Sequence, residues 1–311
     1  MSVSPVATPA FTAIGTPGRP WGDAERAQWR SRLERRRVYA ETVLPRVERL
    51  RATWDVLRYG EVAYDGETFP LFALRSRETD PALPIALVTG GVHGYETSGV
   101  HGALEFAEHH AGEHAGRIQR IVVPCVSPWA FERVQRWNRD AVDPNRSFRP
   151  GSPSAEAAAL IDWLGPVRHR VRVHIDLHET TDSDETEFRP ALAARDGVEF
   201  VPGAIPDGFY LVGDTARPQP GFQQAILEAV AQVAHIAPSD ADGTLIGTPA
   251  TAPGLIEYPV HELGLCVGFS DAPFVTTTEV YPDSPRTTPA ECDAAQVAAV
   301  RAAIGFALAA R

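Results

Sequence analysis

Short apolar runs alternate with amphipathic segments along most of the chain. Runs of strand length are bounded by Gly, Pro or charged residues, and segments between them carry apolar side chains at helical spacing. The expected strands are 85–94, 118–128, 171–179 and 273–282, and the expected helices are 100–112 and 154–165. This alternation predicts an α/β fold with a mixed, largely parallel central sheet and helices on both faces.

The ends of the chain have their own patterns. Residues 1–20 are rich in Pro, Thr and Gly and predict an extended arm, whereas 21–50 predicts a helix that Asp23 caps. Residues 57–76 predict a hairpin with its turn at Asp65-Gly66, and 288–311 predicts a closing helix. We therefore expect an N-terminal arm and helix over 1–53, followed by a domain over 54–311 that contains the sheet.

Composition excludes several classes of partner. Hydrophobic residues make up 44% and charged residues 22% of the chain, as in ordinary globular proteins. Acidic residues outnumber Lys plus Arg by 40 to 29, and the net charge of -11 argues against binding nucleic acid or an anionic membrane. The three cysteines (Cys125, Cys266 and Cys292) form no CxxC pair, which favours a reducing compartment. With no signal-like start and no long apolar run, we expect a cytoplasmic protein.

The first candidate site is the segment His93-Gly94-Tyr95-Glu96, which follows an apolar strand. Ligands bind at the carboxyl ends of strands in open α/β sheets, and zinc accepts both imidazole nitrogen and carboxylate oxygen. His93 and Glu96 are therefore candidate metal ligands. The alternative is a capping Glu beside a hydrogen-bonded His, because HxxE occurs often by chance.

The second candidate site lies in the strand at 171–179. His174, Asp176 and His178 share one face of this strand, within a segment expected to be buried. A buried polar row must be paired or bound to something. His178 is a candidate third ligand, with Asp176 or His174 orienting its ring. The alternative is a hydrogen-bonded network without metal.

Further candidates are two arginines and two glutamates. Arg139 and the pair Asn145-Arg146 offer guanidinium groups that bind a carboxylate or stabilise an oxyanion. Glu279 lies in a Thr-rich apolar strand, where a carboxylate is costly unless used, and it is a candidate general base. Glu257, in an expected loop, is its rival. The chain has no GxSxG, Walker or GxGxxG motif, and the segment at His261 is not HExxH.

The order of these motifs resembles that of the zinc metallocarboxypeptidases and of their relatives, the aspartoacylases and succinylglutamate desuccinylases. The segment DPNRSF is similar to the family's DLNRxF, IDLHETT is similar to the DLHxT of the deacylase branch, and TTEVYP resembles the strand of the catalytic Glu. The resemblance covers roughly residues 54–311.

This resemblance implies a role for each site residue. It implies one zinc ion (Zn²⁺) per chain on His93, Glu96 and His178, with Glu279 as general base and acid. The remaining matches are Asn145 and Arg146 for the substrate carboxylate, Arg139 (or Arg136) for the scissile carbonyl, and Tyr258 or Tyr210 as candidates for the family's tyrosine.

Two substrate classes follow from the resemblance. The main expectation is a carboxypeptidase that acts on a peptide or peptide-like substrate, because the 32 residues after Glu279 read as a linker and a helix. The alternative is an N-acyl amino acid deacylase, which the IDLHETT segment favours; a binding protein without turnover is disfavoured by Glu279. The acidic segment 182–187 is expected to be a solvated loop, or else a pocket wall for a cationic side chain or a second metal.

Overall fold

The computed structural model describes residues 13–64, 66–78 and 80–310. By compactness the chain divides into a smaller unit, Met1–Glu34 with Thr181–Ile205, and a larger unit, Arg35–Thr180 with Pro206–Arg311. These divisions fall at other places than the boundary after residue 53, which stays a prediction about domains. The sheet and the candidate ligands all belong to the larger unit.

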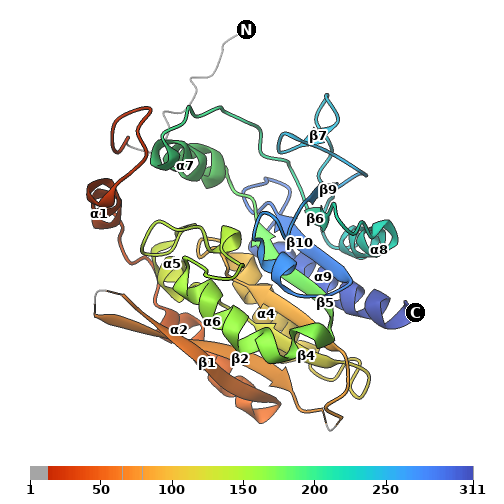
Figure 1. Ribbon diagram of the computed structural model, residues 1–311. Coiled ribbons are helices and arrows are strands. Elements are labelled where there is room, and N and C mark those ends of the chain that lie inside the picture. Colours follow the sequence, from red (N-terminus) through yellow and green to blue (C-terminus); the bar gives the residue numbers. More distant parts are fainter. Residues whose placement is uncertain (1–12, 65, 79, 311) are drawn as a thin grey trace. The chain divides into compact units, whose positions relative to one another are not determined.

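The larger unit is built on an eight-stranded mixed sheet with the order β1-β2-β4-β3-β5-β10-β6-β9 (Figure 1). The four central strands, β4, β3, β5 and β10, run parallel to one another. Strand β2 pairs antiparallel with β1 and β4, and β6 pairs antiparallel with β10 but parallel with β9. This arrangement confirms the predicted fold class. The strands are β1 (Trp54–Tyr64), β2 (Glu67–Ser76), β3 (Ile85–Gly90), β4 (Gln119–Val123), β5 (Val171–Glu179), β6 (Tyr210–Asp214), β9 (Leu255–Tyr258) and β10 (Phe274–Val280). A small hairpin joins β7 (Thr244–Leu245) to β8 (Thr248–Pro249).

Helices cover both faces of this sheet, and Figure 1 shows α6 in front of the strands and α9 behind them. The helices of the larger unit are α2 (Tyr39–Thr42), α3 (Leu44–Arg49), α4 (Thr97–His109), α5 (Pro128–Arg133), α6 (Ala155–Leu164), α8 (Pro220–Val230) and α9 (Pro289–Ala309). The smaller unit contains α1 (Asp23–Ser31), the π-helical turn Asp184–Phe188 and α7 (Arg189–Asp196). Single 3₁₀ turns occur at Leu50–Ala52, Pro144–Arg146, Gly165–Arg170 and Cys266–Phe269.

Side chains alternate between two faces along each strand, which we call the front face and the rear face. The front face carries His174, Asp176 and His178, and it packs against α6 and the 3₁₀ turn Cys266–Phe269 through an apolar core. The rear face packs against α4, α8 and α9. On that side Gln223 of α8 and Gln296 of α9 accept hydrogen bonds from threonines of β10. The candidate ligand His178 therefore lies on the face of the sheet opposite to these rear helices.

The central strands are buried on both faces, as parallel strands covered by helices are. All six residues of β3 are buried, and so are eight of the nine residues of β5. Within β5 the polar side chains of His174, Asp176 and His178 are exposed by at most 1%. Their burial means that each must be hydrogen-bonded or bound to an ion.

The single helix expected over residues 21–50 is wrong. Helix α1 ends at Ser31 and α2 begins at Tyr39, and the segment between them is not helical. There the backbone N–H groups of Arg36 and Arg37 donate to the carbonyl of Glu132, at 2.8 and 3.2 Å. Amphipathic spacing favoured one helix, but this tertiary partner takes the N–H groups that the helix would need.

The other terminal predictions are confirmed where the structure describes them. Strands β1 and β2 form the expected hairpin, and α9 is the expected closing helix. Gly66 adopts a left-handed φ of 85°, whereas Asp65 and residues 1–12 of the expected arm lie outside the described residues. Over the described ranges, α9 is the one helix whose length and apolar composition would suffice to cross a membrane. It packs here between α4 and α8, as a core helix does.

Candidate metal centre

Three donor residues meet where β3 and β5 end. His93 and Glu96 lie in the loop between β3 and α4, and His178 is the penultimate residue of β5. Since β3 and β5 pair in parallel with Gly90 opposite Leu177, their carboxyl ends lie side by side. One potential ligand atom from each of the three residues lies within 4.8 Å of the other two, and the side chains are exposed by 1 to 2%. The structure thus brings the three predicted ligands together.

Glycines allow the ligand loop to pack this closely. A Cβ atom on Gly94 would lie 2.1 Å from the backbone nitrogen of Phe131, and one on Gly90 would lie 2.2 Å from the carbonyl oxygen of Gly99. Any larger residue at either position would push the loop away from α5 or α4. The glycines of this segment therefore help to set the separation of His93 and Glu96.

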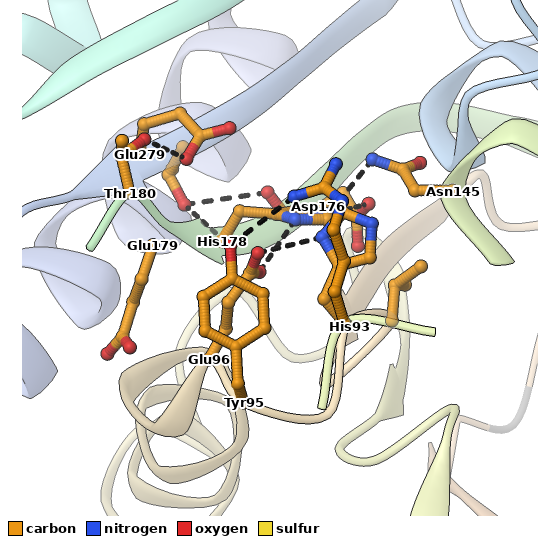
Figure 2. Close-up of polar contacts among 12 residues, drawn as sticks. His93, Tyr95, Glu96, Asn145, Asp176, His178, Glu179, Thr180 and Glu279 are labelled. Atoms are coloured by element: carbon orange, nitrogen blue, oxygen red, sulfur yellow. Dashed lines mark hydrogen bonds and ion pairs between the residues drawn. The ribbon is translucent and has the colours of Figure 1, made fainter. Parts of the chain in front are cut away.

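The two imidazole rings have the same hydrogen-bonding arrangement (Figure 2). Nδ1 of His93 lies 2.7 Å from Oε1 of Glu96, and Nδ1 of His178 lies 2.7 Å from Oε2 of the same carboxylate. Nε2 of His93 lies 2.9 Å from Oδ1 of Asp143, and Nε2 of His178 lies 2.5 Å from Oδ2 of Asp176. Each ring therefore directs Nε2 at an outer carboxylate and Nδ1 at Glu96.

This arrangement fits a bound cation. An ionised carboxylate only accepts hydrogen bonds, so a neutral ring that donates from Nε2 presents an unprotonated Nδ1 toward Glu96. A lone pair facing a carboxylate oxygen at 2.7 Å is repulsive unless the ring is protonated or a cation shares both atoms. Two histidines and one glutamate form a zinc ligand set, and carboxylates on the second ring nitrogen are its usual outer partners. The residues present therefore fit zinc.

The charges around the centre shift several ionisation equilibria. Burial opposes the charge of His178, but the carboxylates of Asp176 and Glu96 outweigh it and raise the pKa of this histidine well above its usual value. Burial also opposes ionisation of Glu96, yet His178 and His93 hold the pKa of Glu96 below its usual range. For Asp143, Arg136 and His93 likewise outweigh burial and lower the pKa. The pocket thus favours ionised carboxylates beside a positive charge.

A buried chain of hydrogen bonds holds the carboxylate of Asp176 in place. The hydroxyl of Thr89 donates to Oδ1 of Asp176 at 2.5 Å and lies 3.2 Å from Nε2 of His174. Nδ1 of His174 lies 3.2 Å from the hydroxyl of Ser270. Of the two residues proposed to orient His178, Asp176 contacts it directly, whereas His174 is linked to it only through Thr89 and Asp176.

Gln296 of α9 fixes His178 from the rear. Its side-chain amide donates to the carbonyl of His178 at 2.9 Å and to the hydroxyl of Ser98 at 3.3 Å, and its oxygen accepts from Thr278 at 2.6 Å. The backbone of this ligand is thereby tied to the closing helix.

Glu279 and Glu257 lie on opposite faces of the sheet. Glu279 of β10 pairs with His178 of β5, and paired residues direct their side chains to the same face. Glu257 lies in strand β9, not in the expected loop, and pairs with Gly213. Gly213 in turn lies on the rear face, because its neighbour Val212 pairs with Thr277. Only Glu279 therefore shares the face of the metal ligands.

Glu279 is held by a threonine and, through it, by a tyrosine. The hydroxyl of Thr180 donates to Oε2 of Glu279 at 2.8 Å (Figure 2). The hydroxyl of Tyr210 lies 2.8 Å from that of Thr180. Tyr210 is 2% exposed, so it supports the carboxylate from within the protein.

The two arginines considered for the scissile carbonyl lie in different surroundings. Nε of Arg136 lies 3.2 Å from Oδ2 of Asp143, and its Nη1 donates to the hydroxyl of Tyr95 at 3.3 Å. Arg139 forms a 2.9 Å ion pair with the adjacent Asp140. Arg136 is thus linked to the candidate ligand His93 through a single residue, Asp143, which contacts both. The assignment to Arg139 stays a prediction.

Asn145 and Arg146 direct their side chains differently. Asn145 is 5% exposed; its side-chain oxygen accepts from the backbone of Cys266 at 2.8 Å, and its Nδ2 lies 3.4 Å from Nε2 of His178. Arg146 is exposed and donates to the carbonyl of Asn145. Although the residue is exposed, the protein around its guanidinium displaces enough water to lower the pKa of Arg146, and the charges of Asp143 and Glu279 act against this shift. Arg146 is therefore the more accessible side chain of this pair.

Several residues of the centre were missed from sequence. Asp143 is the first residue of the segment DPNR, which was noted only for Asn145 and Arg146. A carboxylate two residues before Asn145 was a usable signal. Tyr95 lies between the two ligands of the first motif and gave no signal of its role. Glu179 follows His178 directly, and its carboxylate accepts from the backbone of Thr97 and Ser98 at the start of α4. Burial raises the pKa of Glu179 to about 7.

The acidic segment 182–187 belongs to the smaller unit. There the carboxylate of Asp184 accepts from the backbone of Thr181, and Glu185 pairs with Arg189 at 2.8 Å. Among the residues that the structure describes, His93, Glu96 and His178 are the one group of three donors able to share a metal ion. The hypothesis of a second metal at 182–187 thus gains no support.

Comparison with known proteins confirms the resemblance seen in the sequence. Residues 82–196 match the family described as the Succinylglutamate desuccinylase/Aspartoacylase catalytic domain. This region contains all three candidate metal ligands together with Asn145 and Arg146. No curated protein sequence is similar enough to this chain to count as a relative.

Solved structures share the fold at low sequence identity. A protein of Shewanella amazonensis SB2B assigned to the metallopeptidases is 21% identical, with a TM-score of 0.63 over 85% of this chain and 90% of that one. Carboxypeptidase A of Helicoverpa armigera is 14% identical, with a TM-score of 0.58 over 90% and 76% of the two chains. A metallo-carboxypeptidase of Burkholderia cenocepacia is 15% identical, with a TM-score of 0.56 over 93% and 70%. The chain thus has a carboxypeptidase-like fold.

Proposed function

We propose that the protein is a zinc-dependent hydrolase that cleaves the C-terminal amide bond of a peptide or peptide-like substrate. The observation that carries the proposal is the convergence of two imidazole Nδ1 atoms on the single carboxylate of Glu96, with Glu279 in register beside His178. His93, Glu96 and His178 would hold one zinc ion. When bound, this ion would supply Lewis acidity toward a carbonyl and a water of lowered pKa.

Residues of the protein carry out and support the proton transfers. Glu279 accepts the proton of the attacking water and later delivers it to the leaving amine. Thr180, by donating to Oε2 of Glu279, fixes the orientation of this carboxylate. A carboxylate on a strand is held rigidly enough for this purpose.

We assign the polarisation of the scissile carbonyl to Arg136, in place of Arg139. Its guanidinium is held by Asp143 and Tyr95, both next to the ligand His93. A preorganised cation of this kind stabilises the oxyanion that develops on the carbonyl oxygen.

Arg146 is proposed to bind the free carboxylate of the substrate. Its side chain is exposed, and in the described part of the chain it donates only to the carbonyl of Asn145, so its remaining N–H groups can bind a carboxylate in bidentate fashion. Asn145, buried behind it, holds the loop in place. Tyr258 contributes to the electrostatic environment of Arg146 and remains our candidate for the tyrosine of the site.

The second candidate function is removal of an acyl group from an N-acyl amino acid. It is favoured by the match of residues 82–196 to a deacylase catalytic domain. Both substrates present a carboxylate next to the scissile amide, so the metal centre alone does not separate them.

One experiment tests both candidates. The purified protein is analysed for zinc and then assayed with peptides bearing free or amidated C-termini and with N-acyl amino acids. We expect about one zinc per chain, hydrolysis of free-ended peptides, and a large loss of kcat/KM on amidation. Equal rates on free and amidated ends would exclude the carboxypeptidase, and activity confined to N-acyl amino acids would establish the deacylase.

We also propose that the protein acts in the cytoplasm. All three cysteines are free and buried, as suits a reducing compartment.

A further inference from the structure

The guanidinium of Arg37 contacts the loop that carries two of the metal ligands. Its Nη2 donates to the carbonyl oxygen of Gly94 at 2.5 Å, and its Nη1 donates to the hydroxyl of Thr97 at 2.8 Å. Its Nε donates to the carbonyl oxygen of Phe131 in α5 at 2.6 Å. All three nitrogens of the side chain are therefore engaged, and two of them bind the ligand loop.

These contacts lie next to both ligands of the loop. Gly94 follows His93 directly, and Thr97 follows Glu96 directly. The backbone at Gly94 already touches α5, because a Cβ atom there would lie 2.1 Å from the nitrogen of Phe131. By donating to Gly94 and Phe131 together, Arg37 joins the ligand loop to α5 across this contact.

Arg37 is itself anchored to α5. Its backbone N–H donates to the carbonyl of Glu132 at 3.2 Å, and its guanidinium lies 3.8 Å from the centre of the Phe131 ring. An arginine fixed in this way at both ends has a restricted orientation. Its hydrogen bonds therefore hold the loop at a fixed position relative to α5.

Glu179 holds the same loop from the other side. Its carboxylate accepts hydrogen bonds from the backbone of Thr97 at 3.0 Å and of Ser98 at 2.6 Å. Thr97 is thus bound through its hydroxyl by Arg37 and through its backbone by Glu179. The residue after the candidate ligand Glu96 is thus held both by the guanidinium of Arg37 and by the carboxylate of Glu179.

We propose that Arg37 is a positioning residue of the metal centre: it sets the geometry of His93 and Glu96 through Gly94 and Thr97 without touching the ion or the substrate. The inference rests on the proposed metal site. It also gives a part in that site to the segment before α2, whose role the sequence left open. A ligand set must be held to within about 0.5 Å to bind well, and outer partners of metal ligands typically contribute 10- to 100-fold in affinity.

The test compares Arg37 with its neighbour Arg36. Arg37→Met removes the three donors but keeps an unbranched stem, and Arg37→Lys keeps the charge without the planar fork. Arg36→Met is the matched control, because Arg36 is exposed and directly precedes Arg37 in the same segment. For each folded variant, the zinc dissociation constant is measured by competition with a chelator, and the melting temperature is measured on the zinc-free protein. The visible spectrum of the Co²⁺-loaded protein reports the ligand geometry.

We expect both Arg37 variants to bind zinc about 10- to 100-fold more weakly than the wild type and to show an altered Co²⁺ spectrum. Arg36→Met should match the wild type in both. If Arg37→Met does not fold, Arg37→Lys and Thr97→Val, which removes one acceptor of the guanidinium, decide the question by the same two measurements.

Two results would overturn the inference in different ways. Wild-type zinc affinity and an unchanged Co²⁺ spectrum in the Arg37 variants, even with a lowered melting temperature, would show that Arg37 only stabilises the fold. A wild-type protein that retains no zinc would instead overturn the proposed function, and this inference with it.

Discussion

Asp176 and His178 lie two residues apart on strand β5, and Oδ2 of the aspartate approaches Nε2 of the histidine to 2.5 Å. Alternation along a strand places both side chains on the front face, so the sequence D-x-H is sufficient to bring the pair together. Thr89 then holds the other oxygen of Asp176. The orientation of His178 is therefore determined by its own strand and by the neighbouring one.

The first prediction concerns this pair. Asp176→Asn keeps the size of the side chain but removes its negative charge, and we expect zinc to bind about 10- to 100-fold more weakly. Chelator competition measures the effect. Asp55→Asn, a change in a half-exposed residue paired with Arg75 and Arg77, is the control that should leave the affinity unchanged.

The second prediction concerns the ligand itself. His178→Ala removes one of three ligands, so stoichiometric zinc should be lost while the far-ultraviolet circular dichroism spectrum stays close to that of the wild type. Metal analysis after dialysis decides the matter. A His178→Ala protein that still retained one zinc per chain would show that the ligand assignment is wrong.

The third prediction separates the two glutamates. Glu279→Gln should keep zinc and bind substrate but lose turnover by about 10²- to 10⁴-fold, because the base is removed and its shape is kept. Glu257→Gln lies on the rear face and should retain nearly full kcat. Steady-state kinetics of both variants give the answer, and an active Glu279→Gln beside an inactive Glu257→Gln would reverse the assignment.

The fourth prediction compares the two arginines. Arg136→Met should lower kcat by about 10²- to 10³-fold, as loss of an oxyanion donor does, whereas Arg139→Met should have a small effect. The comparison requires that both proteins hold zinc, since Arg136 also contacts Asp143. A large loss of kcat confined to Arg139→Met would restore the assignment made from the sequence.

The fifth prediction is a pH dependence of stability. Burial lowers the pKa of His174 to about 4, against the opposing charge of Asp176. The groups facing its ring are Asp176, Thr89, Ser270 and the thiol of Cys266. Burial raises the pKa of that thiol, so it stays uncharged. The unfolded chain takes up a proton near pH 6.5 and the folded protein does not, so the stability that neutral His174 contributes is lost as the pH falls from about 6.5 to 4.

His174→Gln removes this titration. The free energy of unfolding of the variant should fall below that of the wild type by the largest amount near pH 7. This difference between the two proteins should shrink by up to roughly 3 kcal/mol at pH 4. Urea unfolding across this range measures it, with the exposed His109→Gln as control. A deficit that is constant with pH would contradict the prediction.

The ligands could be predicted because each lies at, or shortly after, the carboxyl end of a buried strand. His93, Glu96 and His178 needed only the order of strands and the rule that ligands lie at their carboxyl ends. The supporting partners were harder, since Thr89 and Gln296 come from other strands and helices, and only pairing in space makes them partners of His178 or Asp176.

The arginine could not be assigned for a local reason. Between α5 and Asp143 the chain turns through two non-glycine residues with left-handed backbone, Val134 at φ 54° and Ala141 at φ 55°. Such turns carry no strong sequence signal, and they decide whether Arg136 or Arg139 reaches the metal ligands. Strands β6 and β9 also escaped prediction, because they are short and Glu257 was read as part of a loop.

The pairing of Glu279 with His178 makes catalysis a sensitive reporter of strand register. A slip of β10 by one residue against β5 would leave the three metal ligands untouched, since none lies on β10. It would, however, turn Glu279 toward α9 and bring an uncharged neighbour, Thr278 or Val280, to the front face. Protein refolded with this slip would bind its metal in full and hydrolyse nothing, so the ratio of turnover to bound metal measures the fraction of molecules with β10 correctly aligned.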